Sequence, residues 1–272
     1  MIVVITGATN GLGKVVAGNL ARRGAQLAVI ARSPAKVDAL RQEIGPVDAF
    51  FADLSSPREV RRVGEEIAAR HERIDVLVNN AGLHAFAQRV TPDGFSEMVA
   101  LNYLAPWVLT NALRDRLAGR VVTVASGAAR QAGGIDPARD LTSTEPYTRR
   151  ESMELYGRTK LMDIMFSQEL ARRLAGTGVT ANCCDPGFNT TGLGRELPFA
   201  GLLEKTLGAL RIGDPRRGAG IITRLATDPA FATTTGGYFS VKDAKPLVCP
   251  EPGRGEDIQR ALWDATAEIV KS

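Results

Sequence analysis

The feature that most limits the fold of this chain is an alternation of short, nearly continuous apolar runs with longer stretches of helical period. The apolar runs are typical of strands buried on both faces of a parallel sheet. Such strands, alternating with helices over short connections, predict an α/β fold, a Rossmann-type doubly wound parallel sheet in three αβα layers. We expect strands at 2–6, 26–31, 47–51, 74–79 and 120–125, and helices near 12–23, 34–44, 57–71 and 93–117.

The alternation continues through the second half with one interruption. We expect a helix at 151–175, a strand at 178–184, a helix at 216–227, a strand at 237–241 and a last helix at 257–271. Residues 187–215 break the rhythm with glycines, prolines and leucines, which predicts a small lid near 192–215. No repeat or linker separates a second unit, so residues 1–272 are predicted to form a single domain.

Charge and cysteine content narrow the classes of function. The net charge is +4, but the paired arginines are dispersed without interleaved aromatics, which argues against a nucleic-acid partner. The three cysteines show no C-x-x-C spacing, so neither a disulfide framework nor a metal site is predicted. No apolar stretch reaches the ~18 residues of a membrane helix, and no signal peptide is recognisable, so we expect a cytoplasmic protein.

A glycine-rich turn after the first predicted strand points to a cofactor. Thr-Gly-Ala-Thr-Asn-Gly-Leu-Gly occupies residues 6–13, directly before a helix. Glycines let the backbone approach a pyrophosphate closely, and the helix N-terminus offers N–H groups to the phosphates. A turn without a ligand is the plainer alternative, but the position in a βαβ unit favours a dinucleotide. The predicted contacts are Gly7, Thr9, Asn10, Gly11, Leu12 and Gly13.

The end of the second predicted strand indicates which dinucleotide binds. An acidic residue there would bind the ribose 2′-hydroxyl of NAD, whereas this chain has Arg32 followed by Ser33. A guanidinium can pair with the 2′-phosphate of NADP through two hydrogen bonds, and the serine can add a hydroxyl donor. We therefore predict NADP(H), against the alternative that Arg32 is only a surface arginine.

Polar residues recur near the ends of the later strands. Asn-Asn-Ala-Gly follows the fourth strand at 79–82, Asn102 lies in the next helix, and Ser126 ends the fifth strand. Tyr156 and Lys160 are four residues apart on the long helix, so they share one helix face. In isolation this would be an ordinary amphipathic pair, but beside the other motifs it predicts a reactive site.

Together the Thr-Gly-x3-Gly-x-Gly turn, Asn-Asn-Ala-Gly and Tyr-x3-Lys resemble the short-chain dehydrogenase/reductase family, and the resemblance covers essentially the whole chain. The long separation of Ser126 from Tyr156, the run at 168–174 and the tail motifs at 237–240 and 262–263 resemble its retinol dehydrogenase-like branch. The chain departs from membrane-bound retinoid enzymes because we see no anchoring N-terminus. Ala125 also replaces a serine that often precedes the catalytic one.

The resemblance implies an oxidoreductase that transfers a hydride between nicotinamide and a carbonyl or alcohol carbon. Tyr156 would be the acid/base, Lys160 would lower its pKa and hold the nicotinamide ribose, Ser126 would bind the substrate oxygen, and Asn102 would fix a water. The further cofactor contacts that the resemblance implies are Asp53, Leu54, Asn80, Ala81, Gly82, Pro186, Gly187 and Thr191, together with Tyr156 and Lys160.

Two alternatives remain at this point. A catalytically silent NADP-binding sensor would usually lack the tyrosine or the lysine, and both are present. A nucleotide-sugar epimerase or dehydratase would carry Gly-x2-Gly-x2-Gly and a longer C-terminal region. The expected partner is a small, lipophilic carbonyl or alcohol substrate, and a homodimer stays open. His84 is given no role, because a lone histidine is more often structural.

Overall fold

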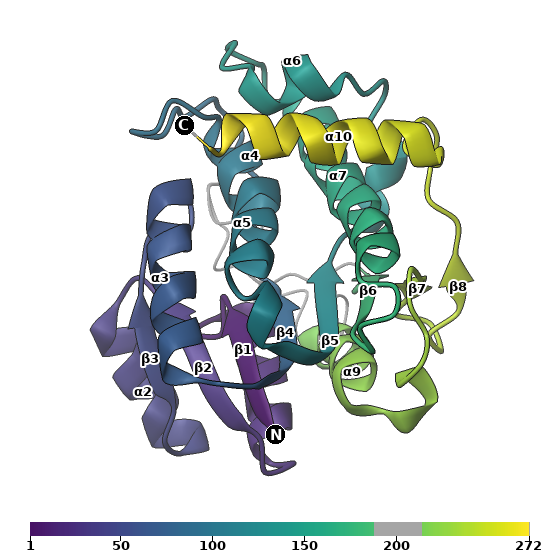
Figure 1. Cartoon of the computed structure of the whole chain (residues 1–272). Coiled ribbons are helices and arrows are strands. Elements are labelled where there is room, and N and C mark those ends of the chain that lie inside the picture. The colour runs from purple at the N-terminus through teal and green to yellow at the C-terminus, as the bar shows by residue number, and fades with distance from the viewer. Residues whose placement is uncertain (188–213, 272) are drawn as a thin grey trace.

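The computed structural model describes residues 1–187 and 214–271, and one sheet forms the centre of this described part (Figure 1). Its strand order is β3-β2-β1-β4-β5-β6-β7-β8, and neighbouring strands are parallel except for β7 and β8. The predicted doubly wound α/β fold is confirmed. The strands are β1 (Ile2–Thr6), β2 (Gln26–Ala31), β3 (Asp48–Phe51), β4 (Ile74–Asn79), β5 (Leu117–Val124), β6 (Thr180–Asp185), β7 (Tyr238–Ser240) and β8 (Pro246–Leu247).

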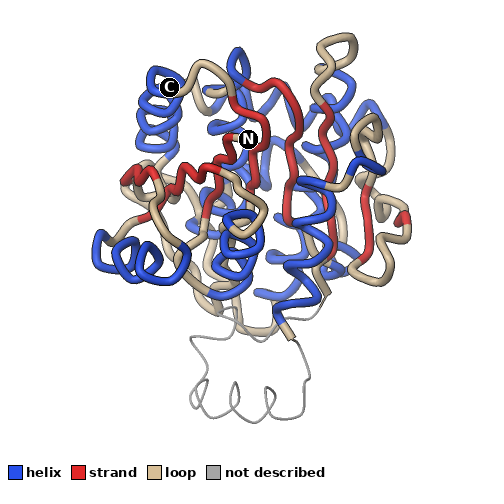
Figure 2. Tube along the Cα trace, turned by 90° about the horizontal axis from the view of Figure 1, so that it is seen from below, coloured by secondary structure: helices blue, strands red, loops and turns tan. Residues whose placement is uncertain are grey.

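Helices lie on both sides of these strands, as Figure 2 shows. On one face α1 packs against α2 and α9, and on the other α3 packs against α5 and α7 against α10. The described helices are α1 (Gly11–Ala21), α2 (Pro34–Ile44), α3 (Pro57–Arg70), α4 (Glu97–Val99), α5 (Ala105–Ala112), α6 (Pro137–Thr142), α7 (Ser152–Arg173), α9 (Pro215–Thr227) and α10 (Glu256–Ile269). The tighter or wider turns are η1 (Ala100–Leu104, a π-helix), η2 (Arg114–Arg116), η3 (Gly127–Gln131) and η4 (Pro229–Phe231).

The apolar strands are buried on both faces, as their sequence predicts. Along β1, Val4 belongs to the core under α3, α5 and α7, whereas Val3 and Ile5 belong to the core under α1 and α9. Successive side chains of a strand point to opposite faces, so a strand between two helical layers needs apolar residues at every position. The central strand β1 pairs with both β2 and β4, which places the change of winding direction between β1 and β4.

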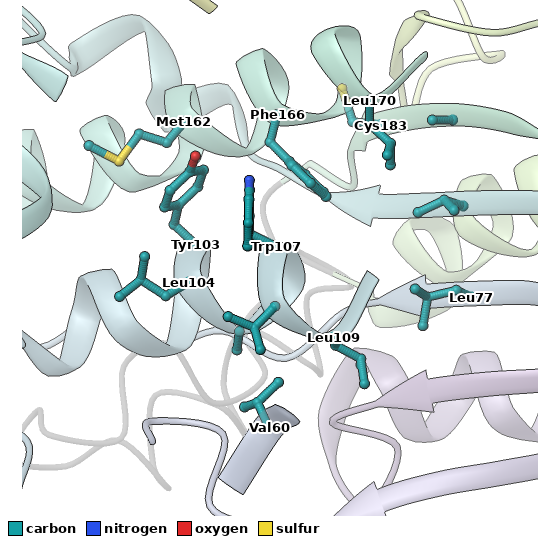
Figure 3. Packing of buried hydrophobic residues seen from close by; sticks show 14 of the residues in the cluster. Val60, Leu77, Tyr103, Leu104, Trp107, Leu109, Met162, Phe166, Leu170 and Cys183 are labelled. Atoms are coloured by element: carbon teal, nitrogen blue, oxygen red, sulfur yellow. The ribbon is translucent and has the colours of Figure 1, made fainter. Parts of the chain in front are cut away.

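The last described helix, α10, lies across α7 on the outside of the molecule (Figure 1). Its Trp263 stacks on Phe166 of α7 with 5.8 Å between ring centroids, and packs against Trp107 of α5 at 5.3 Å. Figure 3 shows Phe166 and Trp107 side by side in this core. The hydroxyl groups of Tyr103 and Thr266 add a buried hydrogen bond of 2.8 Å. The outer surface of α7 is therefore partly covered by the chain itself, and the homodimer stays a prediction.

Several predicted boundaries change in the structure. The helix expected at 93–117 consists of α4, η1 and α5, and Leu117 already belongs to β5 because it pairs with Ile74 of β4. Ser126 does not end β5, because it lies just beyond Val124 as the N-cap of η3. The short elements α6 and β8 had no periodicity to reveal them, and β8 is antiparallel. The lid predicted at 192–215 falls outside the described residues up to 213.

Candidate active site

The glycine turn after β1 is shaped for a close approach of the backbone. Gly7 and Gly11 have φ values of +69° and +53°, a region that favours glycine. A Cβ on Gly13 would lie 2.3 Å from the carbonyl oxygen of Gly7, so α1 can begin against β1 only with glycine there. Asn10, at the N-cap of α1, makes no capping hydrogen bond with its side chain. The first N–H groups of α1 therefore suit a phosphate, which is the fit that a dinucleotide requires.

The segment after β4 is tied directly to this turn. The hydroxyl oxygen of Thr6 accepts hydrogen bonds from the backbone N–H groups of Asn80 (3.0 Å) and Ala81 (2.9 Å). The side-chain amide of Asn80 donates to the carbonyl oxygen of Thr6 at 2.9 Å. These bonds fix the carboxyl ends of β1 and β4 against each other where the sheet reverses its winding, the usual place for a ligand in such folds.

The predicted residues for the adenosine end lie after β2 and β3. Arg32 is exposed and forms no ion pair with another described residue. Ser33 caps α2, and its hydroxyl oxygen accepts from the N–H of Lys36 at 3.4 Å, which leaves its O–H free to donate. One carboxylate oxygen of Asp53 accepts from the N–H and hydroxyl of Ser55, and Leu54 is buried. These residues lie at the carboxyl edge of the sheet, as predicted.

At the carboxyl end of β6, the strand is followed by Pro186 and Gly187. Gly187 has a φ of +72°, and its N–H donates to a carboxylate oxygen of Asp185 at 2.9 Å. A side chain at Gly187 would also meet Val241 at 2.9 Å, so glycine allows the chain to turn here. Thr191, the remaining predicted contact, lies outside the described residues.

Tyr156 and Ser126 come together because α7 and η3 pack unusually closely. A Cβ on Gly157 would lie 2.4 Å from the carbonyl oxygen of Ala128, so a glycine directly after Tyr156 lets η3 rest on the helix. Ser126 caps η3, its hydroxyl oxygen accepting from the N–H of Ala128 at 3.2 Å. A hydrogen bond between the Ser126 and Tyr156 side chains acts to lower the pKa of Tyr156.

Lys160 and Asn102 lie beside this pair, and hydrogen bonds hold both side chains in place. The ammonium group of Lys160 donates to the carbonyl oxygen of Val124 at 2.9 Å and to Asp163 at 2.8 Å. The Asn102 side chain accepts from the N–H of Leu83 and donates to Thr159 of α7 at 3.0 Å. Asn102 therefore connects η1, the loop after β4 and α7, and lies on the π-helical turn rather than in a regular helix.

Burial and neighbouring charges act in opposite directions on Tyr156. Removal from water raises its pKa above the ordinary value, and the charge of Lys160 and the hydrogen bond from Ser126 lower it. The carboxylates of Asp163 and Asp185 add to the raising effect, and the pKa stays raised overall. We expected Lys160 to lower the pKa of Tyr156, and it does so, but burial has the larger effect.

Two residues without a predicted role contact the predicted catalytic set. His84 is buried and stacks on the ring of Tyr156, with 5.0 Å between centroids and 25° between planes. Its Nε2 lies 3.0 Å from the hydroxyl oxygen of Ser152, whose proton goes to the carbonyl oxygen of Arg149, so Nε2 is the donor. The other residue is Asp163, on the same helix face as Lys160. The spacing of three residues from Lys160 could have identified it.

A dinucleotide-type turn where the sheet reverses, with a phenol, an ammonium group and a hydroxyl at the same edge, defines a nicotinamide-dependent oxidoreductase with a Rossmann fold. A model of the short chain dehydrogenase family matches residues 1–137. The chain belongs to the short-chain dehydrogenase/reductase family, whose members use NAD(P) and act on alcohol and carbonyl groups.

Relatives of known name or structure agree with this membership. A Streptomyces protein named "Putative daunorubicin C-13 ketoreductase DnrU" is 35% identical, over 98% of this chain and 92% of its own length. Human retinol dehydrogenase 13 is 34% identical, over 98% of this chain and 84% of its own length. A blue fluorescent protein from a metagenomic library, solved with NADPH, is 28% identical with a TM-score of 0.69, over 89% and 96% of the two chains. The predicted family and branch are confirmed. Across residues 1–187 and 214–271, none of the helices has the length and apolar character to cross a membrane.

Proposed function

We propose that this protein is an NADP(H)-dependent oxidoreductase for a small, lipophilic carbonyl or alcohol substrate, with Tyr156 as the acid/base. The observation that carries the proposal is the environment of Tyr156. Ser126 and Lys160 both act to lower its pKa, at the sheet edge that carries the glycine turn. Residues 1–272 then work as one dinucleotide-binding domain.

The nicotinamide ring would supply or accept the hydride. The glycine turn and the N-terminus of α1 would hold the pyrophosphate, because uncapped N–H groups and the positive end of the helix dipole face it. Arg32 would pair with the 2′-phosphate of NADP, and its exposure without an ionic partner in the described chain supports this assignment. A related protein solved with NADPH also supports NADP over NAD.

The proton would move at the phenolic oxygen of Tyr156. In reduction, Tyr156 would donate its proton to the substrate oxygen as negative charge develops there, and in oxidation it would take the proton back. Ser126 would donate a hydrogen bond to the same oxygen, and Asn102 would keep α7 in register with the loop after β4. Burial favours the protonated form of Tyr156, and the charge of Lys160 stabilises the phenolate that remains after proton transfer.

An aromatic wall beside Tyr156 supports a lipophilic substrate. His84 packs against both Tyr156 and Phe86, with 4.6 Å between the His84 and Phe86 centroids, and the Arg149 guanidinium covers Phe86. Such a surface favours an apolar molecule whose reacting oxygen can reach Tyr156 and Ser126. Among the relatives, a ketoreductase and a retinol dehydrogenase are named, which supports an organic ketone, aldehyde or alcohol.

Turnover of NADPH tests this function. The wild-type protein should oxidise NADPH with members of a panel of hydrophobic aldehydes and ketones that begins with 4-nitrobenzaldehyde. Tyr156→Phe should lower kcat by about 10²–10⁴-fold while NADPH still binds. Tyr103→Phe is the matched control, because Tyr103 is also buried but bonds Thr266 under α10. Tight NADPH binding without turnover across the whole panel would instead establish the silent sensor.

A further inference from the structure

A carboxylate lies directly behind the predicted catalytic lysine. Asp163 follows Lys160 by one turn of α7, and its Oδ2 atom is 2.8 Å from the Lys160 Nζ atom. The side chains are only 1% and 5% exposed, so this is a buried ion pair. The second acceptor for Lys160 is the carbonyl oxygen of Val124, the last residue of β5, at 2.9 Å. Two of the three N–H bonds of the ammonium group are therefore used to hold it between α7 and β5.

The surroundings leave Lys160 little freedom to move away from this position. A Cβ on Gly82 would lie 3.5 Å from Nζ and 3.4 Å from the Asn102 Oδ1 atom, so the loop after β4 closes over the ammonium group. The second carboxylate oxygen of Asp163, Oδ1, is buried and has no hydrogen-bond partner within the described chain. An ionised group with an unsatisfied oxygen is expensive to bury, so a purely structural position would favour an apolar residue.

The charge of Asp163 reaches the groups that pack around it. Lys160 and Tyr156 face it from α7, Tyr103 from η1 and Cys183 from β6. Asp185 of β6 also raises the pKa of Tyr156, and Cys184 of β6 raises that of Lys160.

The pKa shifts show how the pair is balanced. Burial raises the pKa of Asp163 to about 6 against the effect of Lys160. Burial acts to lower the pKa of Lys160, but the charges of Asp163 and Tyr156 outweigh it and the pKa is raised. Lys160 thus stays charged, and the carboxylate of Asp163 weakens the lowering effect of that charge on the pKa of Tyr156.

We propose that Asp163 is a positioning residue of the proposed reaction, which fixes the Lys160 ammonium against the end of β5 and sets how strongly Lys160 acts on Tyr156. The proposal rests on the function proposed above. With the carboxylate present, Tyr156 keeps its proton to higher pH, which favours the proton-donating direction. Without it, the full charge of Lys160 would act on Tyr156, and the phenolate would form at lower pH.

The test is the pH profile of kcat/KM for NADPH and 4-nitrobenzaldehyde, or the first reactive member of the panel. Reduction needs protonated Tyr156, so activity falls on the alkaline side as Tyr156 ionises. Asp163→Asn keeps the size of the side chain and one acceptor for Lys160 but removes the charge. We expect the alkaline limb to move down by about one pH unit, which corresponds to an about tenfold loss of kcat/KM at a fixed pH above the limb. Asp163→Glu, which keeps the charge, should leave the limb near its wild-type position.

Glu169→Gln is the matched control, because Glu169 is the other buried carboxylate of α7 and pairs with Arg172 and Arg173 instead. Its alkaline limb should not move. An unmoved limb in Asp163→Asn, or an equal shift in both variants, would overturn the positioning role. If Asp163→Asn does not fold, Asp163→Ser makes the same comparison. Failure of both to fold, with Asp163→Glu folded, would reduce Asp163 to a structural partner.

A second readout separates this proposal from the proposed function. Tyrosinate absorbance, followed with increasing pH and corrected by subtracting the Tyr156→Phe signal, reports the ionisation of Tyr156 without substrate or turnover. Asp163→Asn should show it at lower pH than the wild-type protein. A shift in an inactive protein would support the role of Asp163 and contradict the oxidoreductase. Turnover without a shift would support the oxidoreductase and contradict the role of Asp163.

Discussion

The turn after β1 and the cluster around Tyr156 lie at the same edge of the sheet, but they are built in opposite ways. The turn depends on missing side chains, because a Cβ at Gly13 would collide with the backbone of Gly7. The cluster depends on charged side chains buried together, with Lys160 and Asp163 nearly inaccessible to water. Steric fit determines the first region and electrostatics the second. A change of pH should therefore affect mainly the second region.

The largest effect is expected where the buried charges are separated. Lys160→Met leaves the carboxylate of Asp163 buried without its partner, which should lower the free energy of unfolding by about 3–5 kcal/mol. The pKa of Asp163 is already raised from 3.8 to about 6 and should rise further. The folded variant then binds this proton more tightly than the unfolded chain, so its stability should fall as pH rises from 3.8 through the raised pKa. Urea denaturation at several pH values measures this.

The double variant Lys160→Met, Asp163→Leu is the control for that prediction. It removes both charges, so most of the stability should return while turnover stays lost. If Lys160→Met alone is as stable near pH 7 as in mild acid, the claim that buried charges control the stability of the second region is wrong.

The shape of the first region is tested by Gly13→Ala. The added methyl group would lie 2.3 Å from the Gly7 carbonyl oxygen and from the Asn80 amide, and relieving this overlap should cost about 1–3 kcal/mol of stability. Affinity for NADPH and NADH should fall together, by the same factor at every pH. Gly220→Ala on α9 is the control, because its Cβ would meet nothing within 4 Å. The free energy of unfolding of Gly220→Ala should rise by up to about 1 kcal/mol.

Arg32→Ala sharpens the comparison because it tests a charge that lies after β2, outside the turn itself, but that is predicted to bind the same cofactor. If Arg32 binds the 2′-phosphate, the Kd for NADPH should rise about tenfold or more, whereas the Kd for NADH should not change. Arg41→Ala, at the other end of α2, should leave both constants unchanged. Equal weakening of the two cofactors by Arg32→Ala would remove Arg32 from the phosphate site. Fluorescence titration of the reduced cofactors provides the measurement.

The smallest effect concerns the aromatic contact between His84 and Tyr156 in the second region. His84→Ala removes the ring that stacks on Tyr156 and should lower kcat/KM severalfold, in line with about 0.5–1.5 kcal/mol for an aromatic pair. His84→Phe keeps the ring and loses the hydrogen bond to Ser152, so its activity should lie closer to wild type. NADPH binding should be the same in both. A larger loss in His84→Phe would make the hydrogen bond, rather than stacking, the important contact.

Sequence patterns predicted most of the first region because its signals are local. The continuous apolar runs predicted the buried parallel strands, and the close approach of Gly13 to Gly7 lies within one βαβ unit. The family resemblance then supplied Ser126, Tyr156 and Lys160, which the structure brings near one another.

The second region was predicted less completely because its contacts join distant segments. His84 meets Tyr156 only after the loop behind β4 is laid on α7, and no periodicity records that contact. The spacing from Lys160 could have indicated the ion pair of Asp163, but the burial of that pair is a property of the assembled fold that the sequence does not show. The net rise in the pKa of Tyr156 also follows from burial, a property of the assembled fold.

The cover that α10 forms over α7 has a consequence for the order in which the protein matures during synthesis. Ser126, Tyr156, Lys160 and Asp163 all leave the ribosome well before Trp263 and Thr266, the residues that close the outer side of the α5–α7 core. Until those arrive, Phe166 and Trp107 lack their contact with Trp263, Tyr103 lacks its hydrogen bond to Thr266, and α7 has one face unsupported. A nascent chain could thus complete its nucleotide-binding half early, while the reactive half waits for the last helix.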